Sequence, residues 1–170
     1  MSAGAAIASY TLAKPTNHLE YLAPLFREAV MSALAECNER VSPSLEAHVY
    51  ETYRSNELQL LYYARGRQVK PPATPVTNAR SNLYSWHGYG LAVDVIHNEK
   101  GWDAGDNWFR NVATVFKKYD CKWGGDWHSP DQPHFQWAAC KPSPSDRARE
   151  LIRTLGIEAV WEAVGATSPA

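Results

Sequence analysis

Apolar residues in the first third of the chain follow two different periods. Between Asn17 and Cys37 they recur every three to four residues, which predicts a helix; Pro24 suits its first turn or a break just before it. From Leu45 to Thr52 apolar and polar residues alternate, as in a strand with one buried face. The change of period predicts a helix followed by a strand.

A short helix and a basic loop are expected next. Ser55 is a suitable N-cap for a helix that ends at Gly66, and the prolines between residues 65 and 80 predict a loop. No acidic residue occurs between Glu57 and Asp94, whereas four basic ones do: Arg65, Arg67, Lys70 and Arg80. These charges form either a solvated loop or a positive rim for an anionic polymer.

The second half of the chain continues the alternation of helices and strands. The order of elements predicts an α+β fold in a single domain over residues 1–170, with a loose N-terminal arm over residues 1–16 and a helical tail over residues 141–170. The expected elements are a strand over Leu91–His97, an amphipathic helix over Asp106–Tyr119, a turn at Gly124 and Gly125, a strand through His134 and Gln136, and two helical pieces in Ser145–Val164 divided at Gly156.

Composition narrows the class of protein. A chain of 170 residues with 45% hydrophobic content can bury a core without disulfides or structural metals. No apolar run approaches the roughly 18 residues of a membrane helix, so we expect no membrane insertion. A net charge of −1 gives no reason to expect nucleic acid as a partner.

The first residues of the chain and its cysteines indicate the cellular compartment in which we expect the protein. Residues 1–13 lack the basic start of a secretory signal, so we expect a protein made in the cytoplasm without a signal peptide. The three cysteines form no CxxC motif, and we expect reduced thiols. A Cys121–Cys140 disulfide is the alternative if the protein works outside the cytoplasm.

Chemistry-bearing side chains are concentrated between residues 86 and 137, which hold six of the seven tryptophans and four of the six histidines. Within Ser85–Asp94, His87 stands in a glycine-flanked loop and Asp94 lies on the strand that follows. Glycines let the backbone fold back, so both side chains can point into one cavity. A carboxylate among apolar neighbours is costly unless a positive group meets it, and a metal ion would meet that need.

A second histidine completes a possible ligand set. Pro133 favours an extended backbone just before His134. Two histidines and one aspartate form a three-ligand set of the kind that holds catalytic zinc, with a fourth position for a water whose pKa falls to about 7. Asp131 is the candidate proton carrier. Each residue also has a structural alternative: a buried histidine for His87, a salt bridge for Asp94 and a turn for Asp131.

Two other histidines are less informative. His97 lies past the end of its predicted strand, and we expect no catalytic role for it. His128 is expected either to contact a ligand histidine or the substrate, or to have no role in the site.

Three motifs in register resemble one known family. They are Ser85-x-His87-x-x-Gly90-x-Ala92-x-Asp94, Trp123-Gly124-Gly125-Asp126-Trp127 and Asp131-x-Pro133-His134-Phe135, preceded by Tyr53-Arg54-Ser55, Gln59, Leu61-Tyr62 and Gly66-Arg67. The pattern runs from about Leu22 to Gln136 and resembles the zinc D-alanyl-D-alanine carboxypeptidase / L-alanyl-D-glutamate endopeptidase family, above all its phage endolysins. The resemblance implies the zinc peptidase fold that hedgehog-type and DD-peptidase domains share, a small antiparallel sheet flanked by helices.

The resemblance also implies roles for individual residues. One Zn²⁺ per chain would be held by His87, Asp94 and His134. Asp131 would be the acid/base residue, and aspartate there favours the endopeptidase branch over the carboxypeptidases, which usually have glutamate.

Several further residues are implied as substrate contacts. Arg54 would bind a substrate carboxylate through its guanidinium fork, the alternative being a structural ion pair with Glu51 or Glu57. Ser55, Gln59 and Ser85 would add hydrogen bonds to the substrate. Asp126 would orient a zinc-bound histidine or, equally, cap a turn.

The function implied is hydrolysis of the L-alanyl-D-glutamate bond in the stem peptide of bacterial peptidoglycan, by a monomeric phage endolysin. Such an enzyme is made in the host cytoplasm and reaches the cell wall in the periplasm after a holin-type partner permeabilises the membrane. The alternatives are a D-alanyl-D-alanine carboxypeptidase, a zinc-bearing wall-binding module without activity, and a metal-free structural protein.

Overall fold

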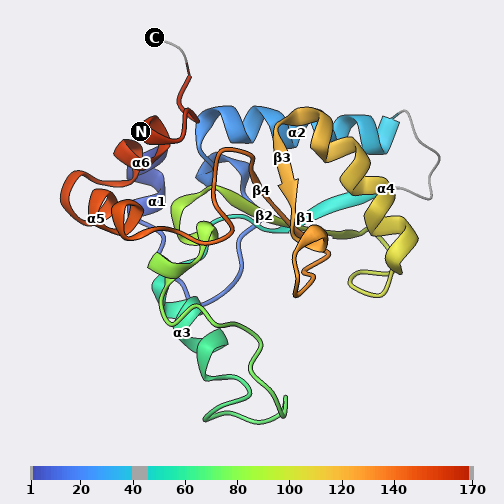
Figure 1. Ribbon diagram of the computed structural model, residues 1–170, viewed down its shortest axis with the longest axis horizontal. Coiled ribbons are helices and arrows are strands. Elements are labelled where there is room, and N and C mark those ends of the chain that lie inside the picture. The colour runs from blue at the N-terminus through green and yellow to red at the C-terminus, as the bar shows by residue number, and fades with distance from the viewer. Residues whose placement is uncertain (1, 40–45, 169–170) are drawn as a thin grey trace.

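A four-stranded antiparallel sheet with strand order β1-β2-β4-β3 lies at the centre of the fold (Figure 1). The computed structural model describes residues 2–39 and 46–168. The strands are β1 (Ala47–Glu51), β2 (Ala92–His97), β3 (Cys121–Trp123) and β4 (His134–Trp137). The sheet and its helices confirm the expected α+β class.

The two central strands separate core residues from site residues. Val93 lies opposite Phe135 in the register, and both side chains are fully buried. One position along, Asp94 lies opposite His134. Because successive side chains of a strand point to opposite faces, the apolar pair packs into the core while Asp94 and His134 face the other side together.

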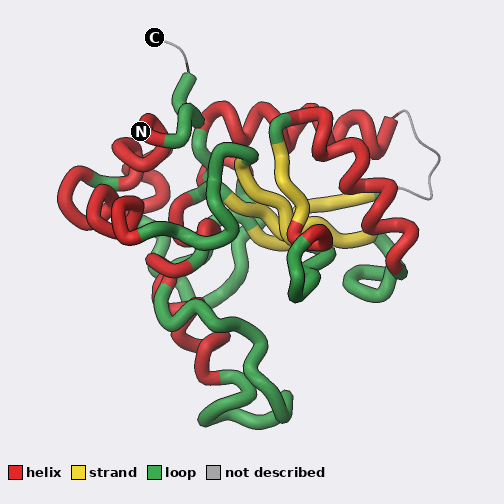
Figure 2. The backbone as a smooth tube through the Cα atoms, viewed as in Figure 1, coloured by secondary structure: helices red, strands yellow, loops and turns green. Residues whose placement is uncertain are grey.

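Helices cover the apolar face and surround the sheet (Figure 2). Across the core, the ring of Phe116 stacks on that of Phe135 with centroids 4.3 Å apart. Within the described ranges, no helix is long and apolar enough to cross a membrane. The helices are α1 (Ala3–Ala8), α2 (Pro24–Glu39), α3 (Asn56–Ala64), α4 (Asp106–Phe116), α5 (Asp146–Leu155) and α6 (Ile157–Ala163), with 3-10 turns at Leu19–Tyr21, Asn82–Tyr84, Trp86–Tyr89, Lys117–Tyr119 and Gly124–Asp126.

The structure differs from the expected elements in three places. The helix expected from Asn17 starts only at Pro24, after a 3-10 turn. Strand β3 was not predicted, because three residues are too few to display an alternation. The expected N-terminal arm contains helix α1, with Ile7 buried in the core and Ser2 accepting a hydrogen bond from the Ala5 amide. Met1, Leu45 and the last two residues of the expected tail lie outside the described residues.

All three cysteines are free and buried, as expected from the absence of a CxxC motif. Burial raises the pKa of Cys37 to about 11 and the pKa values of Cys121 and Cys140 to about 12. Since the thiolate is the reactive form of cysteine, these thiols are chemically inert at neutral pH.

The two C-terminal helices support the turn that carries His87. Trp161 on α6 is 2% exposed, and its indole N–H donates a hydrogen bond of 2.7 Å to the carbonyl of Tyr89. Tyr89 ends the 3-10 turn in which His87 lies. The helical tail is therefore part of the structure that positions the site.

We expect Trp161→Ala to lower the free energy of unfolding by about 3–5 kcal/mol, because it removes a buried ring and leaves a cavity. Urea denaturation followed by circular dichroism measures the change. Leu155→Ala is the control: Leu155 is 71% exposed, and we expect a change below about 0.5 kcal/mol. Equal effects of the two substitutions would contradict a supporting role of the tail.

Candidate metal centre and active site

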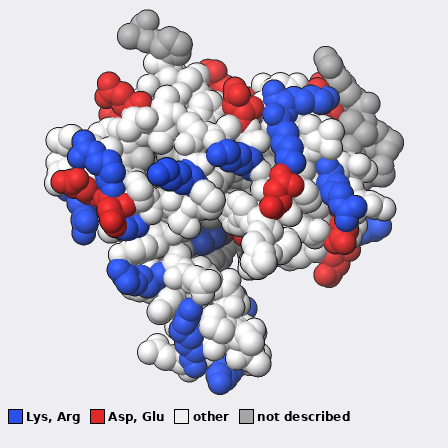
Figure 3. All heavy atoms as spheres, in the orientation of Figure 1, with Lys and Arg blue, Asp and Glu red and all other residues white. Residues whose placement is uncertain are grey.

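A cleft of about 700 Å³ lies between the polar face of the sheet and the lobe formed by α3 and the loop that follows it. Figure 3 shows this hollow where the lobe meets the body of the molecule. Several Lys and Arg side chains lie on the visible face of the lobe, and no acidic side chain is seen among them. The cleft lining includes Arg54, Ser85, His87, Asp94, Asp131, His134 and Gln136.

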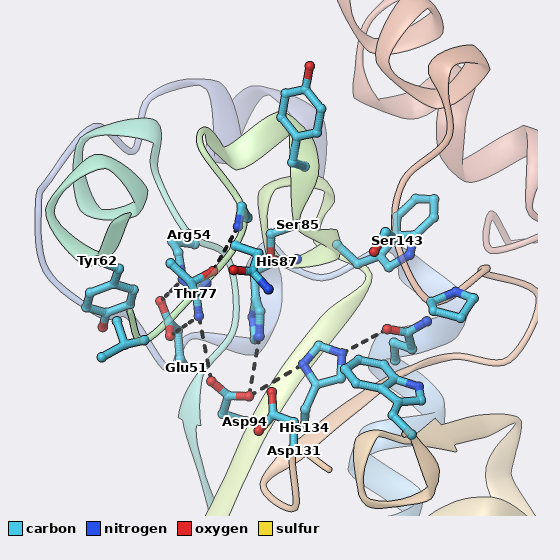
Figure 4. A pocket seen from close by; sticks show the side chains of 18 of the residues that line it. Glu51, Arg54, Tyr62, Thr77, Ser85, His87, Asp94, Asp131, His134 and Ser143 are labelled. Atoms are coloured by element: carbon cyan, nitrogen blue, oxygen red, sulfur yellow. Dashed lines mark hydrogen bonds and ion pairs between the residues drawn. The ribbon is translucent and has the colours of Figure 1, made fainter. Parts of the chain in front are cut away.

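Three side chains from three separate elements converge on the floor of the cleft (Figure 4). One ligand atom each from His87, Asp94 and His134 lies within 4.8 Å of the others. His87 Nε2 is 3.3 Å and His134 Nδ1 is 3.7 Å from Asp94 Oδ1. Bonds of about 2.0–2.2 Å to a tetrahedral zinc would separate neighbouring ligand atoms by roughly 3.3–3.6 Å. The two separations from Asp94 are close to this range, so a small adjustment of the side chains would let the three groups hold zinc.

Hydrogen bonds behind the site fix which ring nitrogen faces the cleft. His87 Nδ1 is 2.9 Å from the carbonyl of Thr52, which can only accept, so Nδ1 carries the proton and Nε2 is left with a lone pair. Gln136 Nε2 donates to the carbonyl of Lys141 at 2.8 Å, so Gln136 Oε1 is the atom that accepts from His134 Nε2, also at 2.8 Å. His134 therefore presents the lone pair of Nδ1.

The charges of the side chains on the floor of the cleft favour a bound positive charge. Burial opposes ionisation of Asp94, but His87 and His134 outweigh it and hold the pKa of Asp94 well below its usual value. Burial lowers the pKa of His134, and the hydrogen bond and charge of Asp94 outweigh this and raise it. Two nitrogen lone pairs around a carboxylate repel it unless a positive charge lies between them, and that charge is either a proton shared with a histidine or a metal ion. The nitrogen and oxygen donors are those that zinc prefers.

Asp131 lies at the edge of the cleft, on the segment just before β4. Its side chain makes no hydrogen bond to any other described residue. Desolvation in the cleft and, after it, the negative charge of Asp94 raise the pKa of Asp131. A carboxylate with a raised pKa beside a metal site is suited to carry a proton.

Arg54 forms a buried ion pair next to the ligands. Its Nε and Nη2 donate to the two carboxylate oxygens of Glu51 at 2.9 and 2.8 Å, and Nη2 is 3.7 Å from Asp94 Oδ2. The structural pairing considered from the sequence is therefore present, with Glu51 and not with Glu57 as partner. Arg54 also lines the cleft, so binding of a substrate carboxylate remains a proposal.

The other expected substrate contacts divide into two groups. Ser85 lines the cleft. Ser55 lies outside it: its hydroxyl caps α3 at the Leu58 amide and donates to the carbonyl of Leu12. Gln59 is fully buried and accepts from Arg54 Nη1 at 3.0 Å. Gln59 is thus placed to position Arg54 rather than to touch a substrate.

Two further candidates lie away from the ligand nitrogens. Asp126 pairs with Lys117 at 2.6 Å on the surface, so the orienting role considered for it is replaced by an ion pair. His128 is exposed and is absent from the cleft lining. The groups that do orient the ligand histidines, the Thr52 carbonyl and Gln136, were not found from the sequence. For Gln136 the signal was its position two residues after His134, on the same face of β4.

We expect Zn²⁺ at 100 times its Kd to raise the free energy of unfolding by about 2.7 kcal/mol, because only the folded chain assembles the ligand set. A chain of this size should then melt about 5–10 °C higher. His87→Ala, Asp94→Ala and His134→Ala should each abolish the rise, whereas the exposed His128→Ala should keep it. Differential scanning calorimetry with and without zinc makes the measurement. A rise that survives all three ligand substitutions would place the metal elsewhere.

We expect Gln136→Leu to weaken zinc binding about 10–100-fold, because His134 Nε2 loses its acceptor and the ring loses its orientation. Competition with a chromogenic chelator measures the affinity. Gln136→Glu keeps an acceptor and should retain more affinity than the leucine variant.

Gln132→Leu is the matched control for this test, since the Gln132 side chain bonds to Asp106 on the surface. It should leave zinc affinity unchanged. Equal losses for Gln136→Leu and Gln136→Glu would speak against hydrogen bonding to His134 as the cause.

Part of the sequence and the fold are similar to those of known proteins. The sequence profile of a family described as D-alanyl-D-alanine carboxypeptidase matches residues 78–137. No curated protein matches the chain. Among solved structures, the Serratia marcescens L-Ala D-Glu endopeptidase ChiX has 20% identity and a TM-score of 0.50 over 77% of this chain and 92% of its own. The LD-carboxypeptidase LdcB has 15% identity and a TM-score of 0.44 over 86% of this chain and 70% of its own. Residues 78–137, which contain His87, Asp94, Asp131 and His134, are therefore similar in sequence to the D-alanyl-D-alanine carboxypeptidase family.

Proposed function

We propose that the protein is a zinc peptidase that hydrolyses the L-alanyl-D-glutamate bond in the stem peptide of bacterial peptidoglycan. The observation that carries the proposal is the convergence of His87, Asp94 and His134 on one point of an open cleft, with Asp131 at its edge. The family match over residues 78–137 supports a peptidase. The choice of bond is supported by the fold shared with ChiX and by aspartate, instead of glutamate, at position 131.

The chain's own residues would handle the protons of the reaction. His87, Asp94 and His134 would hold a zinc ion, whose Lewis acidity would act on the scissile carbonyl and would lower the pKa of a water to about 7. The Asp131 carboxylate accepts a proton from the attacking water and passes it to the leaving amine. The Asp131 side chain makes no hydrogen bond to another described residue, which leaves both carboxylate oxygens available for the proton.

Arg54 and Ser85 would orient the stem peptide. D-Glu is linked through its side chain in peptidoglycan, so its α-carboxylate is free beside the L-Ala–D-Glu bond. Arg54 uses Nε and Nη2 for Glu51 and one N–H of Nη1 for Gln59, which leaves one N–H on each of Nη1 and Nη2 for that carboxylate. Because Glu51 and Gln59 hold the guanidinium in place, little conformational entropy is lost when the substrate binds.

The biological setting belongs to the same proposal. The resemblance to phage endolysins supports a monomer that acts on the cell wall after a holin-type partner has permeabilised the membrane. A D-alanyl-D-alanine carboxypeptidase is the rival, because that activity gives the matched family its description.

Digestion of purified sacculi with the zinc-loaded protein distinguishes the two activities. We expect glycan strands that keep a single L-alanine and soluble peptides that begin with D-Glu, identified by mass spectrometry. Loss of one alanine from the far end of the stem peptide would instead identify a carboxypeptidase. Intact sacculi after prolonged digestion would contradict both.

We expect Asp131→Asn to lower kcat about 10²–10⁴-fold with unchanged zinc content, because the amide cannot accept the proton. Release of soluble peptides, with zinc measured by mass spectrometry on the same sample, gives both values. Asp126→Asn is the matched control, since Asp126 pairs with Lys117 away from the cleft. Full activity of Asp131→Asn would remove the general-base role.

A further inference from the structure

Two exposed aromatic side chains lie at the border of the cleft. Tyr50 is 36% exposed and Trp102 is 48% exposed, and their ring centroids lie 4.8 Å apart at an interplanar angle of 71°. Both line the same cleft as the metal ligands. Exposed aromatic pairs of this kind leave apolar area in water, which is unfavourable unless a ligand covers it.

An irregularity in β1 directs Tyr50 into the cleft. The pairing with β2 runs regularly from Ala47 to Val49 and then passes to Glu51, which lies opposite Asp94, so Tyr50 has no partner in the register. Such a bulge adds one residue to a strand and changes the direction of its side chain. As a result, the consecutive residues Tyr50 and Glu51 both line the cleft. Tyr50 is next to Glu51 along β1, and Glu51 lies opposite Asp94 in β2. The Tyr50 Cα therefore lies within about 9 Å of the Asp94 Cα.

A tight turn after β2 holds Trp102 in place. His97 and Gly101 exchange two backbone hydrogen bonds of 3.2 and 3.0 Å, and His97 Nδ1 accepts from the amides of Glu99 and Lys100, each at 3.0 Å. His97, for which no catalytic role was expected, thus organises the turn that presents Trp102. The indole N–H of Trp102 makes no hydrogen bond to any other described residue and is free to donate to a ligand.

We propose that Tyr50 and Trp102 form a platform for a sugar ring of the glycan strand. This inference rests on the proposed function, because it concerns the substrate of the same cleft. The apolar face of a pyranose suits stacking on an aromatic ring, and its hydroxyl and acetamido groups can accept from the indole N–H. In peptidoglycan the muramic acid sugar is joined through its lactyl group to L-Ala. It therefore lies about two residue lengths, roughly 7 Å, from the L-Ala–D-Glu bond.

The platform would also explain the choice of bond. The D-Ala end of the stem peptide is several residues away from the glycan, so a peptidase that acts there has no sugar beside its metal. A platform close to Asp94 favours the L-Ala–D-Glu bond, which is one residue beyond the lactyl–L-Ala linkage, over the bonds at the D-Ala end.

The test compares two substrates, of which one carries an N-acetylmuramyl group on L-Ala and the other a plain acetyl group. They are N-acetylmuramyl-L-alanyl-γ-D-glutamyl-diaminopimelate and N-acetyl-L-alanyl-γ-D-glutamyl-diaminopimelate. We expect the zinc-loaded protein to cleave the sugar-bearing substrate with a kcat/KM about tenfold higher, and we expect Trp102→Ala to bring the ratio of the two values close to one. Trp102→Phe, which keeps a ring, should retain most of the ratio.

Met31→Ala is the control for loss of an exposed apolar side chain, because Met31 is 53% exposed on α2 and lies outside the cleft lining. It should leave the ratio unchanged. Equal cleavage of both substrates by the unaltered protein, or a ratio that Trp102→Ala does not change, would overturn the sugar platform while leaving the proposed function intact.

A second measurement separates failure of the platform from failure of the proposed function. The disaccharide N-acetylglucosaminyl-N-acetylmuramic acid is titrated into ¹⁵N-labelled protein, and the Trp102 indole signal is assigned from its absence in Trp102→Phe. If neither peptide is cleaved, the proposed function is wrong, and a saturable shift of this signal still supports the platform. An indole signal that stays in place throughout the titration overturns it.

Discussion

A carboxylate lies in a nearly dry position between two imidazole lone pairs, and the site depends on how this repulsion is resolved. The antiparallel register sets Asp94 opposite His134, and the turn at Trp86–Tyr89 brings His87 Nε2 to the same oxygen. Neither ring can turn its protonated nitrogen inward without losing a buried acceptor, which for His87 is the Thr52 carbonyl. A cation at the centre satisfies all three groups at once.

Much of the fold was predictable because its elements are long enough to display a period. The helices around residues 24–39 and 106–116 and the division of the tail at Gly156 followed from spacing and from a single glycine. Strand β3 was missed because it spans only Cys121–Trp123 and is defined by its pairing with β4. Helix α1 was missed because the burial of Ile7, and not intrinsic propensity, holds it in place.

The sequence was sufficient to predict which three side chains converge on the floor of the cleft. Glycines, histidines and aspartates at characteristic spacings indicated which residues converge, but not which groups stand behind them. The partner of His87 is a backbone carbonyl, which every residue possesses and no motif reveals. Ser55 caps α3, as its place before the helix predicted, and its expected contact with the substrate is absent, while Asp126 forms a surface ion pair that no motif indicated. Hydrogen bonds between distant segments depend on the completed packing, and sequence spacing does not determine them.

The inert thiols have a practical consequence. Cys37, Cys121 and Cys140 are all nearly inaccessible, and each has a pKa well above neutrality, so maleimide dyes should spare the unmodified protein. A single cysteine introduced on the surface of the α3 lobe would then carry the only fluorophore. Its emission could report, molecule by molecule, how long the enzyme dwells on a cell-wall fragment, with every native residue of the interior retained.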